Sequence, residues 1–398
     1  MFGGDPDESI FRSQARAWLE EHVGPYRVDA DPDSPSIVFP DVADTDRLDR
    51  GRAWQRALND GGWAGLGWPV EHGGRDLPLA MQAVWAQELN AAGAPSPVNL
   101  LGEAIVGPTL LVHGTVDQQR RFLAPILTAE EIWCQLFSEP DAGSDLASVA
   151  TTATRDGHGW VIDGHKIWAS GAHYADWAIL LARTDSDVAK QEVPKHRGCT
   201  YFLLDMRQPG VSVRPVRQMT GGAAFDEVLL DGAHVADEHR VGAVGGGWAV
   251  AMTTLAHERL QLGLGLARAG GSVERILADM RPRGVADDPI IRQTAARLVI
   301  EARCAQYLGW RLLSRVEVAG GAQPGPEAAV AKLASGRVSQ RYDELADAMR
   351  GAGAMVHDEY TLRQLWAPAT RIAGGTDEVL RNVIAERVLG LPREPRTV

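Results

Sequence analysis

The spacing of apolar and polar residues divides the chain into three stretches. Residues 8–131 contain segments with apolar positions three or four residues apart, separated by breaks such as GWPVEHGG, which is typical of helices. Residues 132–242 change to short runs rich in β-branched and aromatic residues, several of them bounded by Asp-Gly. From residue 246 onward the helical spacing returns. We therefore predict an α+β fold with an N-terminal helical domain at 1–131, a small β-domain of barrel or meander type at 132–242 and a C-terminal helical domain at 243–398.

The same spacing locates the individual elements. Helices are expected at 9–23, 45–63, 77–93 and 116–131 in the first stretch, and at 248–277, 290–319, 327–351 and 376–390 in the last. Strands are expected at 151–170, 176–184, 199–206, 211–216 and 225–232.

The segment TLAHERLQLGLG, residues 254–265, places two opposite charges in an apolar helix. At 100° per residue its leucines cover both sides, with Leu255, Leu262 and Leu266 on one stripe and Leu260 and Leu264 opposite. A helix that is apolar nearly all round is predicted to be buried, yet this one carries Glu258 and Arg259. Because a buried carboxylate is costly unless it is paired or put to use, Glu258 needs a partner, a chemical role, or both.

Composition and charge exclude several classes of function. With 40 Lys and Arg against 52 Asp and Glu, the net charge of −12 argues against nucleic acid and anionic membranes as partners. The three cysteines, Cys134, Cys199 and Cys304, are far apart and form no CxxC pair, so neither a disulfide framework nor a metal site is expected. The N-terminus lacks a signal pattern and no run of 18 apolar residues occurs, so we expect a cytoplasmic protein without a membrane segment.

Two short motifs in the β-rich stretch suggest a ligand that carries an anion and a flat ring. In SEPDAGSD, residues 138–145, the small residues Gly143 and Ser144 let backbone N–H groups and a hydroxyl approach a pyrophosphate closely. In KIWAS, Trp168 offers a flat apolar face and Ser170 a hydroxyl, two residues apart and therefore on the same side of a strand. Each motif alone also has a structural interpretation, as a plain turn and as a core tryptophan.

Together these motifs resemble the acyl-CoA dehydrogenase family. The matching segments span nearly the whole chain in the family's order: GWPVEHGG (67–74), SEPDAGSD (138–145), GHKIWASGAHYADWAILLART (164–184) and AGGTDEVLRNVIAERVLG (373–390). The resemblance implies an N-terminal helical domain, a β-domain and a C-terminal four-helix bundle, with non-covalent FAD held between them at a dimer interface.

The resemblance also implies roles for individual residues toward FAD. The flavin ring would meet Phe137, Ser138, Trp168 and Ser170, and the pyrophosphate would meet Gly143 and Ser144. Thr376 and Glu378 would bond the adenosine end or its pyrophosphate, Gln135 would also contact the cofactor, and the FAD of a neighbouring subunit would meet Gly351 and Gly353. An alternative stays open for Thr376 and Asp377, which could simply cap the helix that follows them.

Dehydrogenation of an acyl thioester needs one base for the α-proton, and the resemblance offers two positions for it. In many family members the base directly precedes a Gly-Thr pair; here that position is Gly374, which cannot accept a proton. In the branch typified by isovaleryl- and long-chain-type enzymes the base is a glutamate on the buried helix, followed by arginine, which matches Glu258 and Arg259. Glu258 would then be the base, Arg259 would orient it, and the Gly374 N–H would polarise the thioester carbonyl. The alternative is an ion pair between Glu258 and Arg259 that braces two helices.

One segment departs from the family pattern. Where the family has Arg-x-x-Phe-Gly, the chain reads ADMRPRGVADDPIIRQ and lacks the phenylalanine. Arg281 or Arg283, together with Gln293, could still contact a neighbour's FAD. A homodimer or homotetramer is expected, and a heteromer in which a related chain completes the site stays possible.

The expected function is FAD-dependent dehydrogenation of acyl-CoA, with electrons passed to an electron-transfer flavoprotein. An oxidase or monooxygenase on the same scaffold, a carrier-protein thioester as substrate, and a non-catalytic subunit of a heteromer are the alternatives. Branched, long or ring-bearing acyl groups are favoured by the helix-borne base.

Overall fold

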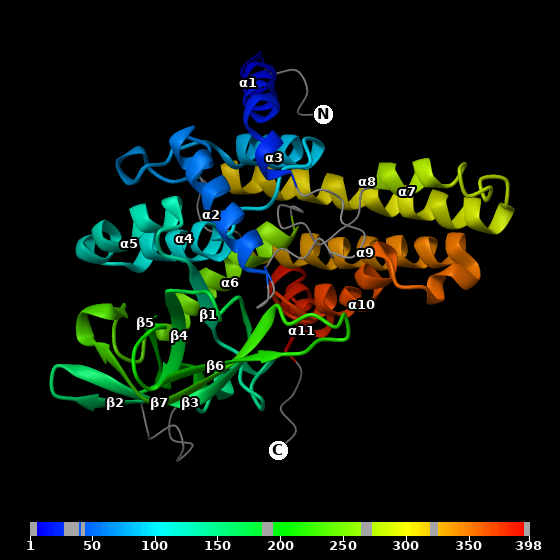
Figure 1. Cartoon of the computed structure of the whole chain (residues 1–398). Helices are drawn as coiled ribbons and strands as arrows, with labels where there is room; N and C mark the ends of the chain where they lie inside the picture. The colour runs from blue at the N-terminus through cyan, green and yellow to red at the C-terminus, as the bar shows by residue number, and fades with distance from the viewer. Residues whose placement is uncertain are drawn as a thin grey trace. The chain divides into compact units, whose positions relative to one another are not determined.

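The computed structural model describes residues 6–27, 40, 44–184, 194–263, 273–318 and 325–393. These residues form two compact units. The first unit contains residues up to 77 and residues 88–257, and the second contains 78–87 and the described residues from 258 onward. The predicted α+β class, with helices before and after a central sheet, is confirmed (Figure 1). The domain boundaries at 131/132 and 242/243 stay a prediction.

The helices of the first third follow the predicted positions closely. They are α1 (Pro6–His22), α2 (Thr45–Asp60), α3 (Leu79–Ala91), α4 (Gly107–His113) and α5 (Val116–Thr128). Helix α5 begins with a capping box, in which the Thr115 side chain accepts from the Gln118 N–H and the Gln118 side chain accepts from the Thr115 N–H. Helix α4 was not predicted. It continues directly from a π-helical turn at Gly102–Val106, and Pro108 is its second residue.

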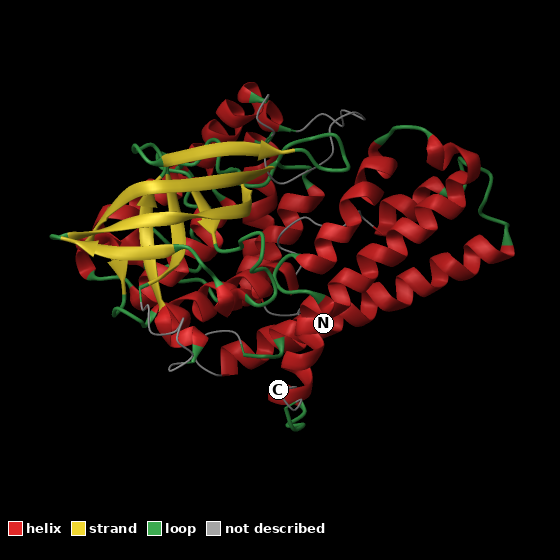
Figure 2. Cartoon of the chain, turned by 90° about the horizontal axis from the view of Figure 1, so that it is seen from below, coloured by secondary structure: helices red, strands yellow, loops and turns green. Residues whose placement is uncertain are grey.

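The central stretch forms an eight-stranded sheet (Figure 2). Its strands are β1 (Trp133–Leu136), β2 (Thr152–Asp156), β3 (Gly159–Ser170), β4 (Trp177–Arg183), β5 (Cys199–Asp205), β6 (Val211–Val216), β7 (Phe225–Ala236) and β8 (Arg240–Val241). The order is β6-β7-β3-β2-β4-β5-β8, with β1 parallel to β4. The predicted strands are confirmed, and the segment 151–170 proves to be the β2–β3 hairpin, which turns at Gly157 with a φ of 57°.

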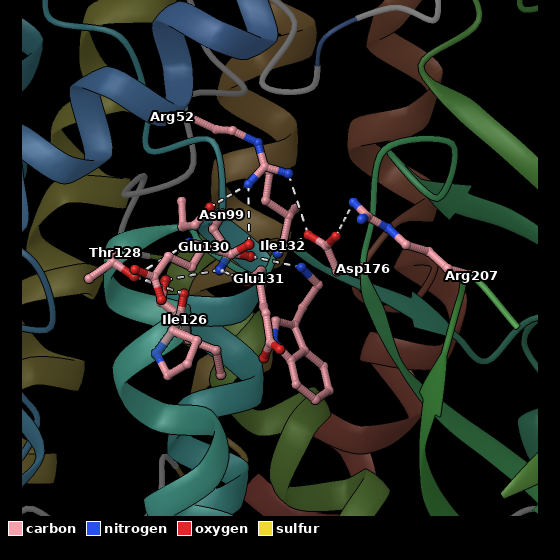
Figure 3. Close-up of polar contacts among 12 residues, drawn as sticks. Arg52, Asn99, Ile126, Thr128, Glu130, Glu131, Ile132, Asp176 and Arg207 are labelled. Atoms are coloured by element: carbon pink, nitrogen blue, oxygen red, sulfur yellow. Dashed lines mark hydrogen bonds and ion pairs between the residues drawn. The ribbon is translucent and has the colours of Figure 1, made fainter.

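A buried polar junction fixes the start of β1 against the N-terminal helices (Figure 3). The Asn99 side chain accepts from the Trp133 N–H at 2.9 Å and donates to the carbonyls of Ile126 and Glu131, both at 2.9 Å. Asp176 accepts from the Ile132 N–H at 2.9 Å, and it also pairs with Arg52 at 3.4 Å and with Arg207. Strand β1 ends two residues before Ser138, so this junction positions the strand that leads into the SEPDAGSD loop, residues 138–145.

Helix α6 (Gly247–Gly263) carries the candidate base. Its buried residues include Val250, Ala251, Thr254 and Leu260, and the Thr254 hydroxyl bonds the Tyr201 hydroxyl of β5 at 3.0 Å. The prediction of a buried helix holds in that no described residue from 250 to 262 is exposed, although Leu255 and Glu258 are only half-buried. Leu264 and Leu266, and with them the predicted continuation of the helix to residue 272, lie outside the described residues.

The second unit is helical. Its elements after α6 are α7 (Val273–Asp279), α8 (Pro289–Val318), α9 (Ala328–Arg350), α10 (Glu359–Ile372) and α11 (Asp377–Val383), followed by a π-helical turn at Ile384–Val388. Helices α8 and α9 lie side by side, and their shared core includes Leu298 and Leu345 (Figure 1). Helix α10 was not predicted, and it contains Pro368 in its interior. No helix among the described residues is long and apolar enough to cross a membrane.

Candidate active site

The loop after β1 begins at residues that pack or bond against the sheet, and its small residues further along are exposed. Gln135 is half-buried within β1, the Phe137 side chain is buried, and the Ser138 carbonyl accepts from the Ile167 N–H at 3.0 Å. Further along, Gly143 and Ser144 are exposed. A Cβ atom added to Gly143 would meet no protein atom within 4 Å, so the fold itself leaves the space over this backbone open.

Two buried charged residues that the sequence analysis did not single out hold this loop. Lys166 of β3 is fully buried, and its ammonium group bonds the Glu139 carboxylate at 2.8 Å. Burial lowers the pKa of Lys166 to about 8, although the negative charge of Glu139 opposes that shift. Burial also opposes ionisation of Glu139, but the charge and hydrogen bond of Lys166, together with the hydrogen bonds from Thr151 and Ala150, bring the pKa of that carboxyl below its usual value. Both positions occur in the motifs SEPDAGSD and KIWAS, and only their burial distinguishes them from surface charges.

Trp168 reaches the surface because β3 is bulged. Trp160, Ile162 and Lys166 share the buried face of the strand, and regular alternation would bury Trp168 as well. A register shift against β7 between Ile167 and Ala169 places Ala169 on the buried face and leaves Trp168 55% exposed, with a φ of 64°. The alternation that was expected to place Trp168 and Ser170 on one face is therefore broken at Trp168; Ser170, the last residue of β3, is half-buried.

These features fit a flavin nucleotide. An exposed indole offers a flat face to an aromatic ring, and the open space over Gly143 beside an exposed hydroxyl suits a pyrophosphate. A tryptophan held in the left-handed region is strained, and such strain persists where the surrounding structure imposes it, often at binding sites.

In the second unit, Glu258 lies beside the turn that contains Gly374. A Cβ atom built on Gly374 would lie 3.5 Å from the Glu258 Oε1 atom and 2.5 Å from the Leu262 Cδ1 atom. Gly374 and Gly375 have φ values of 68° and 100°, a region that glycine adopts without strain. The carboxylate on α6 thus borders the space that a side chain on residue 374 would enter, and the Leu262 side chain fills part of that space.

Two cationic side chains hold the carbonyl groups of this glycine turn. Arg259 Nε donates to the Gly374 carbonyl at 3.4 Å, and Lys332 Nζ of α9 donates to the Gly375 carbonyl at 2.8 Å. Burial lowers the pKa of both side chains. The charge of Glu258 partly offsets the shift of Arg259, and the charges of Asp377 and then Glu258 partly offset that of Lys332. Lys332 was missed by the sequence analysis, since a lysine on a predicted helix ordinarily faces solvent.

The residues after this turn begin α11. The Thr376 hydroxyl accepts from the Val379 N–H at 3.3 Å, so Thr376 is the N-cap and the capping role left open by the sequence is confirmed. Asp377 is buried and pairs with Arg371 at 2.8 Å, whereas Glu378 is exposed and pairs with Arg381 at 3.4 Å. Contacts of Thr376 and Glu378 with a cofactor stay a prediction.

The residues expected to meet a neighbouring subunit are exposed. Gly351 and Gly353 lie in a 3₁₀ turn that Arg350 stabilises through a 2.7 Å bond to the Gly353 carbonyl. Arg281 and Gln293 are also exposed. Arg283 is exposed too, with its guanidinium 5.5 Å from the centre of the Tyr360 ring.

Comparison with known proteins identifies one family along nearly the whole chain. Profiles of the acyl-CoA dehydrogenase N-terminal, middle and C-terminal domains match residues 5–130, 134–232 and 245–389. The acyl-CoA dehydrogenase IpdE1 of Mycobacterium tuberculosis is 40% identical over 402 residues, covering 98% of this chain and 99% of that protein.

Solved structures of related proteins share the fold. The Tcur3481–Tcur3483 steroid ACAD superposes with a TM-score of 0.82 at 29% identity, over 98% of this chain and 99% of that one. The ChsE4–ChsE5 complex from Mycobacterium tuberculosis gives a TM-score of 0.81 at 26% identity, over 99% and 100%. This protein belongs to the acyl-CoA dehydrogenase family and is a flavoprotein oxidoreductase that acts on acyl-CoA.

Proposed function

We propose that the protein is an FAD-dependent dehydrogenase that converts an acyl-CoA thioester to its trans-2-enoyl thioester, with Glu258 as the base. The observation that carries the proposal is the approach of the Glu258 carboxylate to Gly374. Since the Glu258 oxygen lies 3.5 Å from the Cβ position of residue 374, a base on α6 and a base on the turn would serve the same space. The turn has no carboxylate of its own, so Glu258 supplies it.

Each residue of this group has a distinct task in the proposal. Glu258 accepts the α-proton of the thioester. Arg259 holds the Gly374 carbonyl and keeps the turn against the base, and the Gly374 N–H donates to the thioester carbonyl so that the α-proton becomes more acidic. FAD, when bound, supplies the acceptor for the hydride that leaves the β-carbon. Electrons then pass to an electron-transfer flavoprotein.

The proposed substrates are acyl-CoA thioesters with branched, long or ring-bearing acyl groups. The helix-borne glutamate supports this choice, because it resembles the base of the isovaleryl- and long-chain-type branch, in which more room is left beside the thioester. A related structure named as a steroid ACAD also supports a ring-bearing acyl group.

Spectroscopy of the purified protein tests the proposed function. We expect a yellow protein that releases its flavin on acid precipitation and is bleached anaerobically by a member of a panel of straight, branched and ring-bearing acyl-CoAs. Slow reoxidation by air, with fast reoxidation by an electron-transfer flavoprotein, would support a dehydrogenase over an oxidase. A colourless protein that FAD does not reconstitute would contradict the proposal.

Removing the exposed ligand groups of the first unit should weaken FAD binding without unfolding the protein. The double change Ser144→Ala and Trp168→Ala should remove one bond to a charged group and one aromatic contact, roughly 2 to 4 kcal/mol or about 30- to 1,000-fold in Kd. Flavin fluorescence titration of the apoprotein measures this change. Ser212→Ala, at an exposed serine of β6, is the control and should bind FAD as the wild type does. If the double variant binds FAD with the wild-type Kd, then Ser144 and Trp168 have structural roles only.

The protein should assemble from at least two chains. Gly351 and Gly353, proposed to contact a neighbour's FAD, are exposed in a turn where Met355 is 89% exposed, so an isolated chain would leave the cofactor half-held. Light scattering coupled to absorbance should show a dimer or larger assembly that contains FAD. A second, related chain should be required if the protein alone stays monomeric and flavin-free, an arrangement that would resemble the ChsE4–ChsE5 complex. A monomer with full FAD occupancy is the result that would overturn this prediction.

A further inference from the structure

We propose that the buried ion pair between Glu139 and Lys166 is a positioning device for the 138–145 loop, and that it sets the affinity for FAD. The inference rests on the proposed function, because it concerns the same cofactor. It goes further by assigning this role to two residues that would not touch the flavin themselves.

Lys166 uses all three of its N–H donors. Its ammonium group bonds the Phe137 carbonyl at 3.1 Å, the Glu139 Oε1 atom at 2.8 Å and the Leu181 carbonyl at 2.8 Å. An ammonium has three donors, so this buried cation is fully satisfied. Phe137 immediately precedes the loop and Leu181 lies in the middle of β4, so Lys166 ties the start of the loop to the centre of the sheet.

Glu139 ties the segment that follows the loop, at Ala150 and Thr151, to the start of the loop. One carboxylate oxygen accepts from the Ala150 N–H at 2.6 Å, and the other accepts from the Thr151 N–H at 2.9 Å. Glu139 and Ala142 also exchange backbone hydrogen bonds, each of 3.1 Å. The two ends of a fourteen-residue connection, Ser138 to Thr151, are thus held by one buried pair, while Gly143 and Ser144 stay exposed.

This arrangement serves preorganisation more than stability. Replacing a buried ion pair by neutral groups of similar size is often nearly neutral for stability, whereas removing one partner leaves an uncompensated charge and is costly. The directional bonds to Phe137, Ala150 and Thr151 do something that apolar packing cannot, since they define one conformation of the loop before a ligand arrives. A loop ordered in advance loses less entropy on binding, which increases affinity.

A double-mutant cycle on the apoprotein separates these two effects. The variants are Lys166→Met, Glu139→Gln and the double variant, and the measurements are the melting temperature without ligand and the Kd for FAD by fluorescence titration. We expect Lys166→Met to lower the melting temperature because Glu139 is left buried without its cation. The double variant should recover most of that loss, yet its Kd for FAD should stay raised by about tenfold or more, since the loop ends are no longer held.

An ion pair between a buried carboxylate and a half-buried arginine in the second unit is the control. Asp343 of α9 is 7% exposed and pairs with Arg363 of α10 at 2.9 Å, in the second unit. The double variant Asp343→Asn and Arg363→Met should change the melting temperature but not the Kd for FAD.

The outcomes distinguish the inference from the function on which it rests. A raised Kd in the Glu139/Lys166 double variant, with a recovered melting temperature and an unaffected control, supports a positioning role. A Kd that returns to the wild-type value together with the melting temperature would overturn it, as would an equal change in the control pair. Wild-type apoprotein that fails to bind FAD at all would overturn the proposed function, and the inference with it.

Discussion

Replacing Glu258 by glutamine is expected to leave acyl-CoA binding intact and to slow flavin reduction by about 10³-fold or more. Glutamine keeps the shape of the side chain beside Gly374 but cannot accept the α-proton, and a positioned general base contributes up to about 10⁴-fold. Anaerobic stopped-flow measurement of flavin bleaching gives the rate. The shift of the flavin spectrum on mixing with acyl-CoA reports binding separately.

The control for this variant is a glutamate of similar exposure outside the site. Glu301 of α8 pairs with Arg341 at 3.2 Å, and Glu301→Gln should bleach at the wild-type rate. If Glu258→Gln also reduces flavin at close to the wild-type rate, Glu258 is no base. The ion-pair brace with Arg259 would then be the better interpretation.

Moving the base from α6 to the glycine turn is expected to restore part of the lost activity. The Cβ position of residue 374 lies 3.5 Å from the Glu258 oxygen, so a carboxylate carried by either segment can reach the same space. Two obstacles are visible: the built Cβ would lie 2.5 Å from Leu262 Cδ1, and the φ of 68° costs a non-glycine residue roughly 1 to 2 kcal/mol. The design is therefore the triple variant Glu258→Gly, Leu262→Ala and Gly374→Glu.

The matched control combines Gly374→Gln with the same Glu258→Gly and Leu262→Ala changes. The two variants then have side chains of the same size and the same backbone strain at residue 374, and they differ only in the carboxylate. The triple variant with glutamate should bleach at least tenfold faster than the control with glutamine. It should remain slower than the wild type, because no neighbouring side chain holds the introduced glutamate in a productive rotamer. Equal rates in the two variants would show that the two positions do not share one space in the reaction.

Local pattern was enough to predict most of the secondary structure. Helix α5 and the β2–β3 hairpin were predicted because their signals are short-range: the apolar spacing within residues 116–131, and an Asp-Gly turn at residue 157. Helices α4 and α10 were not predicted. Each contains a proline, Pro108 or Pro368, and a proline in the sequence indicates a helix break unless its place in the helix is known.

Some features of the candidate site are also local in the sequence, and others depend on contacts between distant residues. The sequence by itself determined which residue types were available: a carboxylate on an apolar helix, no carboxylate at residue 374, and a small-residue loop at 138–145. That Glu258 and Gly374 meet was inferred from the family and is an observed proximity only in the folded chain, because 116 positions separate them.

The tertiary structure alone decided how Trp168, Lys166 and Lys332 are used. A bulge turns Trp168 outward against the alternation of its strand, and its place depends on the pairing of β3 with β7. Lys166 and Lys332 resemble surface charges in the sequence, yet each is buried and donates to a carbonyl group at least 15 residues away. Such partners become visible only in the fold, since the burial of a charge depends on which distant acceptors surround it.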